Sequence, residues 1–111
     1  MLRALRPHSE EQVLAPFAEN VPPLLLSAPL PAEFVVFVTT PNDLRDTRPH
    51  PAPRRQLVFV LDGEIEIETS DGERRTFPPG GVVLVEDTVG SGHMTRVSKG
   101  RASFVAVPLL G

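Results

Sequence analysis

The sequence contains no cysteine, tryptophan or tyrosine, and ten of its eleven basic residues are arginine. Without cysteine, the chain can form neither a disulfide framework nor a thiolate metal site. The net charge is -3 and the six phenylalanines are the only aromatic residues. Nucleic-acid-binding proteins typically present a basic surface and aromatic side chains on which bases stack. We therefore expect no nucleic-acid partner.

Long hydrophobic runs are also missing. The longest apolar stretches have the length of strands, so we expect no membrane partner. Residues 1–18 include Arg3, Arg6, Pro7 and two glutamates where a signal peptide would have an apolar run. We therefore expect a cytoplasmic protein, and 111 residues argue for a single domain.

Proline dominates the first part of the chain, residues 1–33. Ser9–Gln12 is a capping-box pattern that predicts a short helix through Ala15. Four prolines between positions 22 and 31 exclude a long helix after it. Leu24–Leu26 is an apolar run between these prolines and predicts a short edge strand or a segment packed on a neighbour. We interpret residues 1–33 as an N-terminal extension with edge strands.

The pattern from residue 34 onward predicts β-structure. Turn residues punctuate this region, and we predict hairpin turns at Asp62-Gly63 and at Ser70–Gly72. The predicted strands are Phe34–Thr39, Leu57–Leu61, Glu64–Thr69, Arg74–Phe77, Val82–Glu86, Met94–Ser98 and Ala102–Val107. Short strands at this spacing are typical of an all-β sandwich or barrel.

The predicted strand at Glu64–Thr69 alternates strictly between apolar and acidic residues. Ile65 and Ile67 are expected to face inward, because side chains two residues apart share one face of a strand. Glu64, Glu66 and Glu68 then form an acidic stripe on the other face. We interpret this stripe as a solvated face that discourages pairing at a sheet edge.

A frame of glycine and proline residues makes the fold prediction more specific. Six residues separate Gln56 from Gly63, and Gly72 is followed by Pro78 and Gly80. This frame resembles the two sequence motifs of the cupin superfamily over about residues 45–90. The resemblance implies a double-stranded β-helix, the jelly-roll barrel of cupins, over residues 34–107, with residues 1–111 as one cupin domain.

The resemblance extends to a subgroup of small, mostly uncharacterised bacterial cupins, in which a run like Arg54-Arg55-Gln56 precedes the same strand. Metal-binding cupins carry three histidines and one glutamate in the two motifs. This chain keeps His50 and has other residues at the remaining positions, namely Ala52, Gln56 and Val83. The resemblance therefore implies that the standard metal site is absent, and we expect no cofactor.

A rearranged metal site is the alternative. His50, Asp87 and His93 would supply two imidazoles and a carboxylate, a set that suits iron, zinc, manganese or nickel. Each residue also has a simpler interpretation. His50 lies in a proline-rich loop where a solvated histidine is common, His93 can hydrogen-bond a turn, and Asp87 can cap its loop through an Asx-turn.

Strand alternation also predicts a ligand site. Apolar side chains deep in the barrel and polar groups near its mouth are the usual composition of a small-molecule site. The residues expected to line it are Gln56, Val58, Val83, Val85, Asp87 and His93. We predict a protein that binds a small-molecule ligand in the barrel.

Catalysis is the alternative function. His50, Asp87 and His93 can serve as acid and base groups, because histidine titrates near neutral pH and a carboxylate can orient it, or as the rearranged metal site. Either use suits an isomerase, epimerase, cyclase or dioxygenase-like enzyme. A structural module with a filled interior is the third hypothesis. Under all three we expect a homodimer, because Leu24–Leu26 and the two-sided apolar strands leave surplus hydrophobic surface. The cupin resemblance implies dimerisation through sheet extension.

Overall fold

The computed structural model describes residues 2–5, 11–46, 48, 50–88, 90 and 92–110. Every regular element in these ranges is a β-strand, which confirms the all-β prediction. The strands are β1 (Leu2–Leu5), β2 (Gln12–Ala15), β3 (Leu24–Ser27), β4 (Val36–Thr39), β5 (Gln56–Asp62), β6 (Ile65–Thr69), β7 (Arg74–Phe77), β8 (Val82–Val85), β9 (His93–Arg96) and β10 (Ser103–Pro108). No helix in the described ranges has the length and apolar character needed to cross a membrane.

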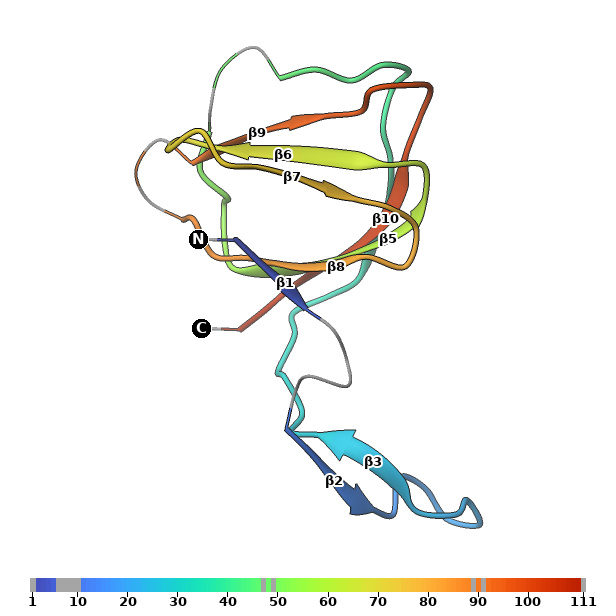
Figure 1. Cartoon of the computed structure of the whole chain (residues 1–111). Helices are drawn as coiled ribbons and strands as arrows, with labels where there is room; N and C mark the ends of the chain where they lie inside the picture. Colours follow the sequence, from blue (N-terminus) through green and yellow to red (C-terminus); the bar gives the residue numbers. More distant parts are fainter. Residues whose placement is uncertain are drawn as a thin grey trace.

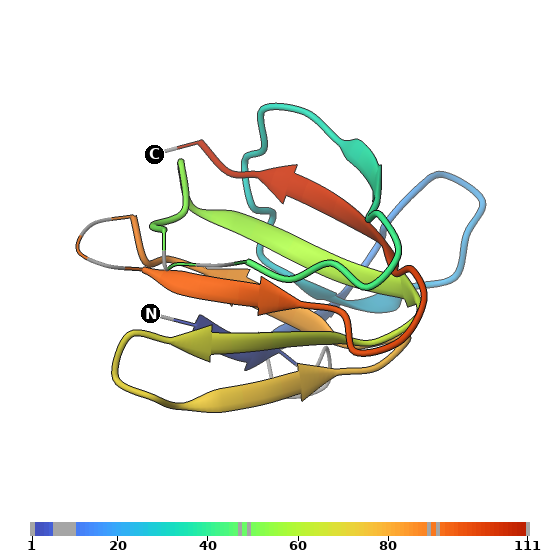
Figure 2. The ribbon, with the colours of Figure 1, turned by 90° about the horizontal axis from the view of Figure 1, so that it is seen from above.

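Two sheets form the body of the molecule. The larger has five antiparallel strands in the order β1-β8-β5-β10-β4, and the smaller has three in the order β7-β6-β9. The two sheets lie face to face in both views (Figures 1 and 2). The remaining strands, β2 and β3, pair with each other as a hairpin that projects away from the body (Figure 1).

The hydrophobic core lies between these two sheets. β6 presents Ile65 and Ile67, which are 3% and 5% exposed, so the predicted alternation of this strand is confirmed. They belong to one buried cluster with side chains of β5, β8 and neighbouring segments, namely Ala52, Val58, Val60, Phe77, Val83, Val85, Val97 and Ala102. Val83 is the largest fully buried side chain in the described ranges.

The five-stranded sheet is also apolar on its outer face. Leu57, Leu84 and Leu109 form a second buried cluster there. Partly buried side chains surround them, namely Leu5, Phe59, Val82 and Val107. An antiparallel sheet with one solvated face normally alternates between apolar and polar residues. This sheet therefore carries two apolar faces, of which only the inner one is covered by the three-stranded sheet.

The predicted helix near Ala15 is wrong. Ser9 and Glu10 lie outside the described residues, and Gln12–Ala15 form β2. Val13 lies opposite Leu26 and Leu14 opposite Leu25 in the pairing with β3. Cross-strand contacts between such apolar side chains stabilise a hairpin. They outweigh the local capping signal, which is only a weak preference.

The predicted hairpin at Asp62-Gly63 is also wrong. β5 pairs with β8 and β10, whereas β6 pairs with β7 and β9, so the chain crosses from one sheet to the other at Gly63. Gly63 has a φ of 73°. A Cβ atom on it would lie 2.5 Å from the carbonyl oxygen of Arg101, so no larger residue fits this crossing. The predicted turn at Ser70–Gly72 does join two paired strands, β6 and β7.

Candidate functional site

Two histidines lie side by side at one end of the body. His50, in the segment before β5, forms an isolated antiparallel bridge with His93 at the start of β9. The N–H of each residue donates to the carbonyl oxygen of the other at 2.9 Å. The two imidazole centroids are 5.1 Å apart with the rings tilted by 54°. This separation is within the range of direct contact between rings.

Asp87 orients the ring of His93. Its Oδ2 lies 2.5 Å from Nδ1 of His93, and the two side chains are only 11% and 9% exposed. A carboxylate oxygen accepts hydrogen bonds, so the proton of the neutral ring sits on Nδ1 and donates to Asp87. This leaves Nε2 as the ring atom with a free lone pair. The carbonyl oxygen of Asp87 also accepts a hydrogen bond from the N–H of Ala52 at 2.9 Å. This bond joins the loop after β8 to the segment that carries His50.

The second carboxylate oxygen of Asp87 is buried. Within the described part of the chain, Oδ1 has no hydrogen-bond partner. An unsatisfied buried acceptor typically costs about 1–3 kcal/mol, and more when it is charged. The carboxylate that orients His93 therefore has a second oxygen, Oδ1, that accepts no hydrogen bond from the described residues.

His50 has its own carboxylate partner. Its Nε2 donates to Oδ2 of Asp46 at 2.9 Å, and the same oxygen accepts the N–H of Thr95 at 2.8 Å. The side chain of His50 is 53% exposed. The site thus contains a buried histidine–aspartate pair and a second pair at the surface. Sequence reasoning missed Asp46, for which its four-residue separation from His50 was the only signal.

The structure separates the predicted ligand residues into two groups. Val58, Val83 and Val85 are 8%, 1% and 3% exposed and belong to the core cluster. They pack the interior and do not line a space that is open to water. Gln56 is half-buried and lies opposite Val85 in the strand pairing. Val85 is two residues before Asp87 in the chain. The polar residues of the predicted site lie at one end of this core, where Asp87 and His93 are themselves largely buried.

The rearranged metal site at this end stays an alternative hypothesis. Among the described residues, no three His, Asp or Glu side chains are arranged so that they could hold a metal ion. The three proposed ligands are close in space. The contacts among them are the hydrogen bond between His93 and Asp87 and the ring contact between His93 and His50.

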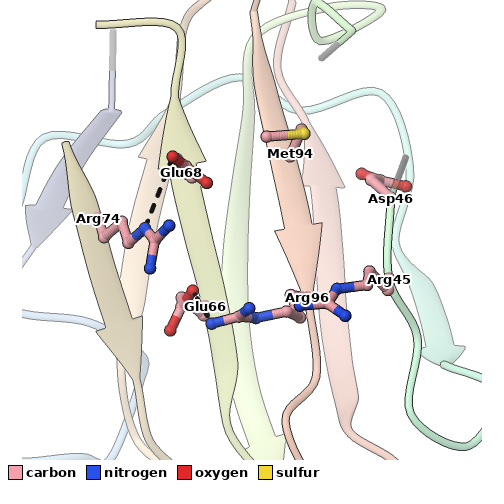
Figure 3. Close-up of a pocket in the computed structure, with 7 residues that line it drawn as sticks. All are labelled: Arg45, Asp46, Glu66, Glu68, Arg74, Met94 and Arg96. Carbon is pink, nitrogen blue, oxygen red and sulfur yellow. Dashed lines mark hydrogen bonds and ion pairs between the residues drawn. The ribbon is translucent and has the colours of Figure 1, made fainter. Parts of the chain in front are cut away.

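A different cluster covers the outer face of the three-stranded sheet (Figure 3). Glu66 pairs with Arg96 at 2.6 Å, and Glu68 pairs with Arg74 at 3.5 Å. Because β6 is the central strand of this sheet, the idea that its acidic stripe protects a sheet edge is wrong. The carboxylates instead neutralise arginines on the neighbouring strands.

A cavity of about 190 Å³ lies over these ion pairs. Its lining is Arg45, Asp46, Glu66, Glu68, Arg74, Met94 and Arg96 (Figure 3). A second cavity of about 350 Å³ shares Arg45 and Arg96. Ligand pockets typically measure about 300–1,000 Å³ and are mostly apolar, so the first cavity is small and highly charged by comparison. Two of its arginines are already held by glutamates, and neither of these two cavities is lined by His50, Asp87 or His93.

Comparison with known proteins adds information on the fold. No protein-family model and no curated protein sequence matches the chain. The crystal structure of protein NMB1881 from Neisseria meningitidis is similar, with a TM-score of 0.53 and 20% sequence identity. The match covers 68% of this chain and 72% of that chain. At this identity, the likeness concerns the fold alone.

Proposed function

We propose that this protein is a cupin-type jelly roll that binds a small organic molecule at its histidine end. Two observations support the cupin part. The two sheets face one another around one core. The glycines that match the cupin frame, Gly63, Gly72 and Gly80, have φ values of 73°, 89° and 88°. These conformations favour glycine and explain its presence in the frame on physical grounds.

The binding part rests on one observation, which is the buried Oδ1 of Asp87 without a partner among the described residues. A ligand that donates an O–H or N–H group to this oxygen would remove the cost of leaving it unsatisfied. The adjacent imidazoles of His50 and His93 supply further polar contacts. The chemical class that fits is a small hydroxylated or amino compound with an apolar part that contacts the end of the core.

A ligand screen tests this proposal. We would measure thermal stabilisation and amide chemical-shift changes with a panel of polyols, sugars, amines and hydroxy acids. We expect a ligand that shifts the resonances of His93 and Asp87. Asp87→Asn should weaken its affinity at least tenfold, which corresponds to about 1.4 kcal/mol.

Asp62→Asn is the matched control, because Asp62 is an exposed aspartate at the far end of β5. It should leave the affinity unchanged. A ligand that binds Asp87→Asn as tightly as the wild type would rule out this site, and so would a panel in which every hit shifts only residues of the arginine–glutamate face.

Acid–base catalysis is the second candidate function, and the Asp87–His93 hydrogen bond is the observation that favours it. Asp87 fixes the tautomer of His93, and Nε2 can then remove a proton from a bound substrate. The rings of His50 and His93 are in contact, so a substrate cannot lie between them. An isomerase or epimerase that places its substrate between these two bases is thereby excluded, and His93 would act from one side.

Kinetics distinguish binding from catalysis once a ligand is known. For a catalyst, His93→Gln should abolish turnover, and Asp87→Asn should lower kcat more than it changes KM. Exchange of ligand C–H protons with deuterated solvent, observed by NMR, is the direct readout. Bound ligand that shows no exchange and no conversion over hours would leave the binding proposal standing and reject the catalytic one.

A further inference from the structure

The hairpin of β2 and β3, here called the arm (residues 12–27), has no partner strand in the body. β2 and β3 pair only with each other among the described strands. The arm extends beyond the side of the molecule formed by the five-stranded sheet (Figure 1). An isolated two-stranded hairpin is at best marginally stable in water. The arm therefore needs a surface to pack against.

The arm and the chain that follows it are unusually apolar. Residues 12–37 contain only two charged residues, Glu19 and Glu33. Eleven large hydrophobic side chains between positions 13 and 37 are at least 40% exposed, with Leu14 at 65% and Phe37 at 78%. Soluble monomers rarely leave so many large apolar side chains of one segment in water, because large apolar patches usually mark an interaction site.

The outer face of the five-stranded sheet is the complementary surface. Phe37 on β4 lies opposite Val105 of β10, and Val105 lies opposite Phe59 of β5, so an apolar row crosses the sheet. Phe59 continues the row to Val82 on β8. This row borders the buried cluster around Leu57 and Leu84. The face is thus apolar from one side of the sheet to the other.

We propose that the arm of one molecule packs on the outer sheet face of a second copy, and that the second arm packs on the first copy in return. Each chain carries both the arm and the face, so a two-fold axis buries both sets at once. If each of the eleven exposed side chains has an accessible surface on the order of 100 Å², residues 13–37 can bury roughly 1,000 Å² in an interface. A standard interface buries about 800 Å² per partner.

The segment that follows the arm, residues 31–34, is the base of the arm and is attached to the body. The N–H of Leu110 donates to the carbonyl oxygen of Pro31 at 3.0 Å, and the N–H of Glu33 donates to that of Pro108 at 2.9 Å. Arg54 pairs with Glu33 and lies over the ring of Phe34, 5.7 Å from its centroid. These contacts fix where the chain leaves the body. A fixed base lowers the entropy cost of ordering the arm on a partner.

Sedimentation velocity and light scattering test the assembly. We expect the wild type at micromolar concentration to have twice the chain mass of 12.1 kDa. Leu14 and Leu25 lie opposite each other on the arm, and the double variant Leu14→Glu/Leu25→Glu should raise the dimer Kd at least 100-fold. Phe37→Glu on the sheet should have the same effect.

Lys99→Glu is the control, because Lys99 is exposed and lies in the connection between β9 and β10, outside both the arm and the apolar row. It should remain dimeric. The arm contributes no residue to the buried core, so the arm variants should keep the circular dichroism spectrum and the cooperative melting of the wild type. A monomeric wild type would overturn the proposal, and so would a dimer that survives both sets of glutamate substitutions.

Cross-linking tests whether each arm lies on the sheet of the other copy. Single cysteines can be introduced for this purpose because the sequence contains none. Leu14→Cys and Phe37→Cys variants are mixed and treated with a short bifunctional maleimide. We expect cross-links between the unlike chains, since the arm of one copy lies on the sheet of the other. Cross-links found only between two Leu14→Cys chains would show an arm-to-arm contact and contradict the proposed arrangement.

Discussion

The carbonyl oxygen of His50 lies 2.1 Å from the position that a Cβ atom on Gly92 would occupy. Gly92 also has a φ of 77°, which is uncommon for other residues. The close approach allows His93, the next residue, to form its backbone bridge with His50. The missing side chain of Gly92 is therefore a condition for the histidine pair.

Gly92→Ala should consequently separate the two histidines. We expect a loss of stability of about 1–3 kcal/mol from the backbone conformation, with a further loss because the new methyl group meets backbone atoms. Gly90→Ala is the matched control, since Gly90 has a φ of 78° but a Cβ atom added to it would meet nothing within 4 Å. Urea denaturation compares the two. Equal losses would mean that the contact with His50 does not matter.

The tautomer of His93 can be measured directly. Because Asp87 accepts from Nδ1, we expect the neutral ring of His93 to carry its proton on Nδ1, whereas that of His50 carries it on Nε2 through Asp46. Long-range ¹⁵N–¹H NMR spectra distinguish these forms. Asp87→Ala should shift His93 toward the Nε2–H form, and Asp46→Ala should change only His50. A wild-type His93 protonated on Nε2 would contradict the observed pairing.

Ile67→Ala tests whether the interior is a packed core. Ile67 is 5% exposed between the two sheets. Truncating a large aliphatic side chain in a packed core typically costs about 2–5 kcal/mol. Glu68→Ala on the opposite face of β6 is the control and should cost less than about 1 kcal/mol, as expected for a surface ion pair. A cost for Ile67→Ala as small as that of the control would indicate a loosely packed interior.

Asp71 gives the β6–β7 turn a dependence on pH. The hydroxyl of Thr69, followed by the N–H of Glu73, lowers the pKa of Asp71 below its ordinary value of 3.8. A lowered pKa means that the stabilisation is complete above the unfolded-state pKa and is lost as the pH falls through the folded-state pKa.

Asp71→Asn should therefore be less stable than the wild type by a constant amount at neutral pH. The difference should shrink below about pH 4, where the wild-type carboxyl group also loses its charge. Urea midpoints of both proteins across this range are the measurement. A difference that does not shrink as the pH falls through the acid range would show that the charge of Asp71 contributes nothing.

From residue 34 onward, local patterns predicted the strands well but not their partners, whereas β1 was not predicted and β2 was predicted as a helix. Arg74–Phe77 was predicted with its observed bounds, and the inward face of β6 was correct, because alternation depends only on neighbouring residues. The crossing at Gly63 was not predictable. A glycine turn has the same appearance whether it joins paired strands or two sheets, and the long-range pairing with β10 decides between them.

The site was predictable to a similar extent. The cupin resemblance and strand alternation pointed to His50, Asp87 and His93, and the structure brings these three together. The burial of Val58, Val83 and Val85 in the core depends on how closely the sheets approach, which no sequence pattern reports. Asp46 was missed because its contact with Thr95 joins segments 49 residues apart.

The pairing of β1 with β8 has a consequence for how the molecule is made. Leu2 lies opposite Val85, and β10, near the end of the described chain, lies between β5 and β4. The large sheet cannot be complete until the chain from β1 through β10 has left the ribosome. Pairings between such distant segments also form slowly. We expect the newly made chain to keep its apolar strands uncovered for longer than a helical protein of the same length, and to depend on chaperones during that interval.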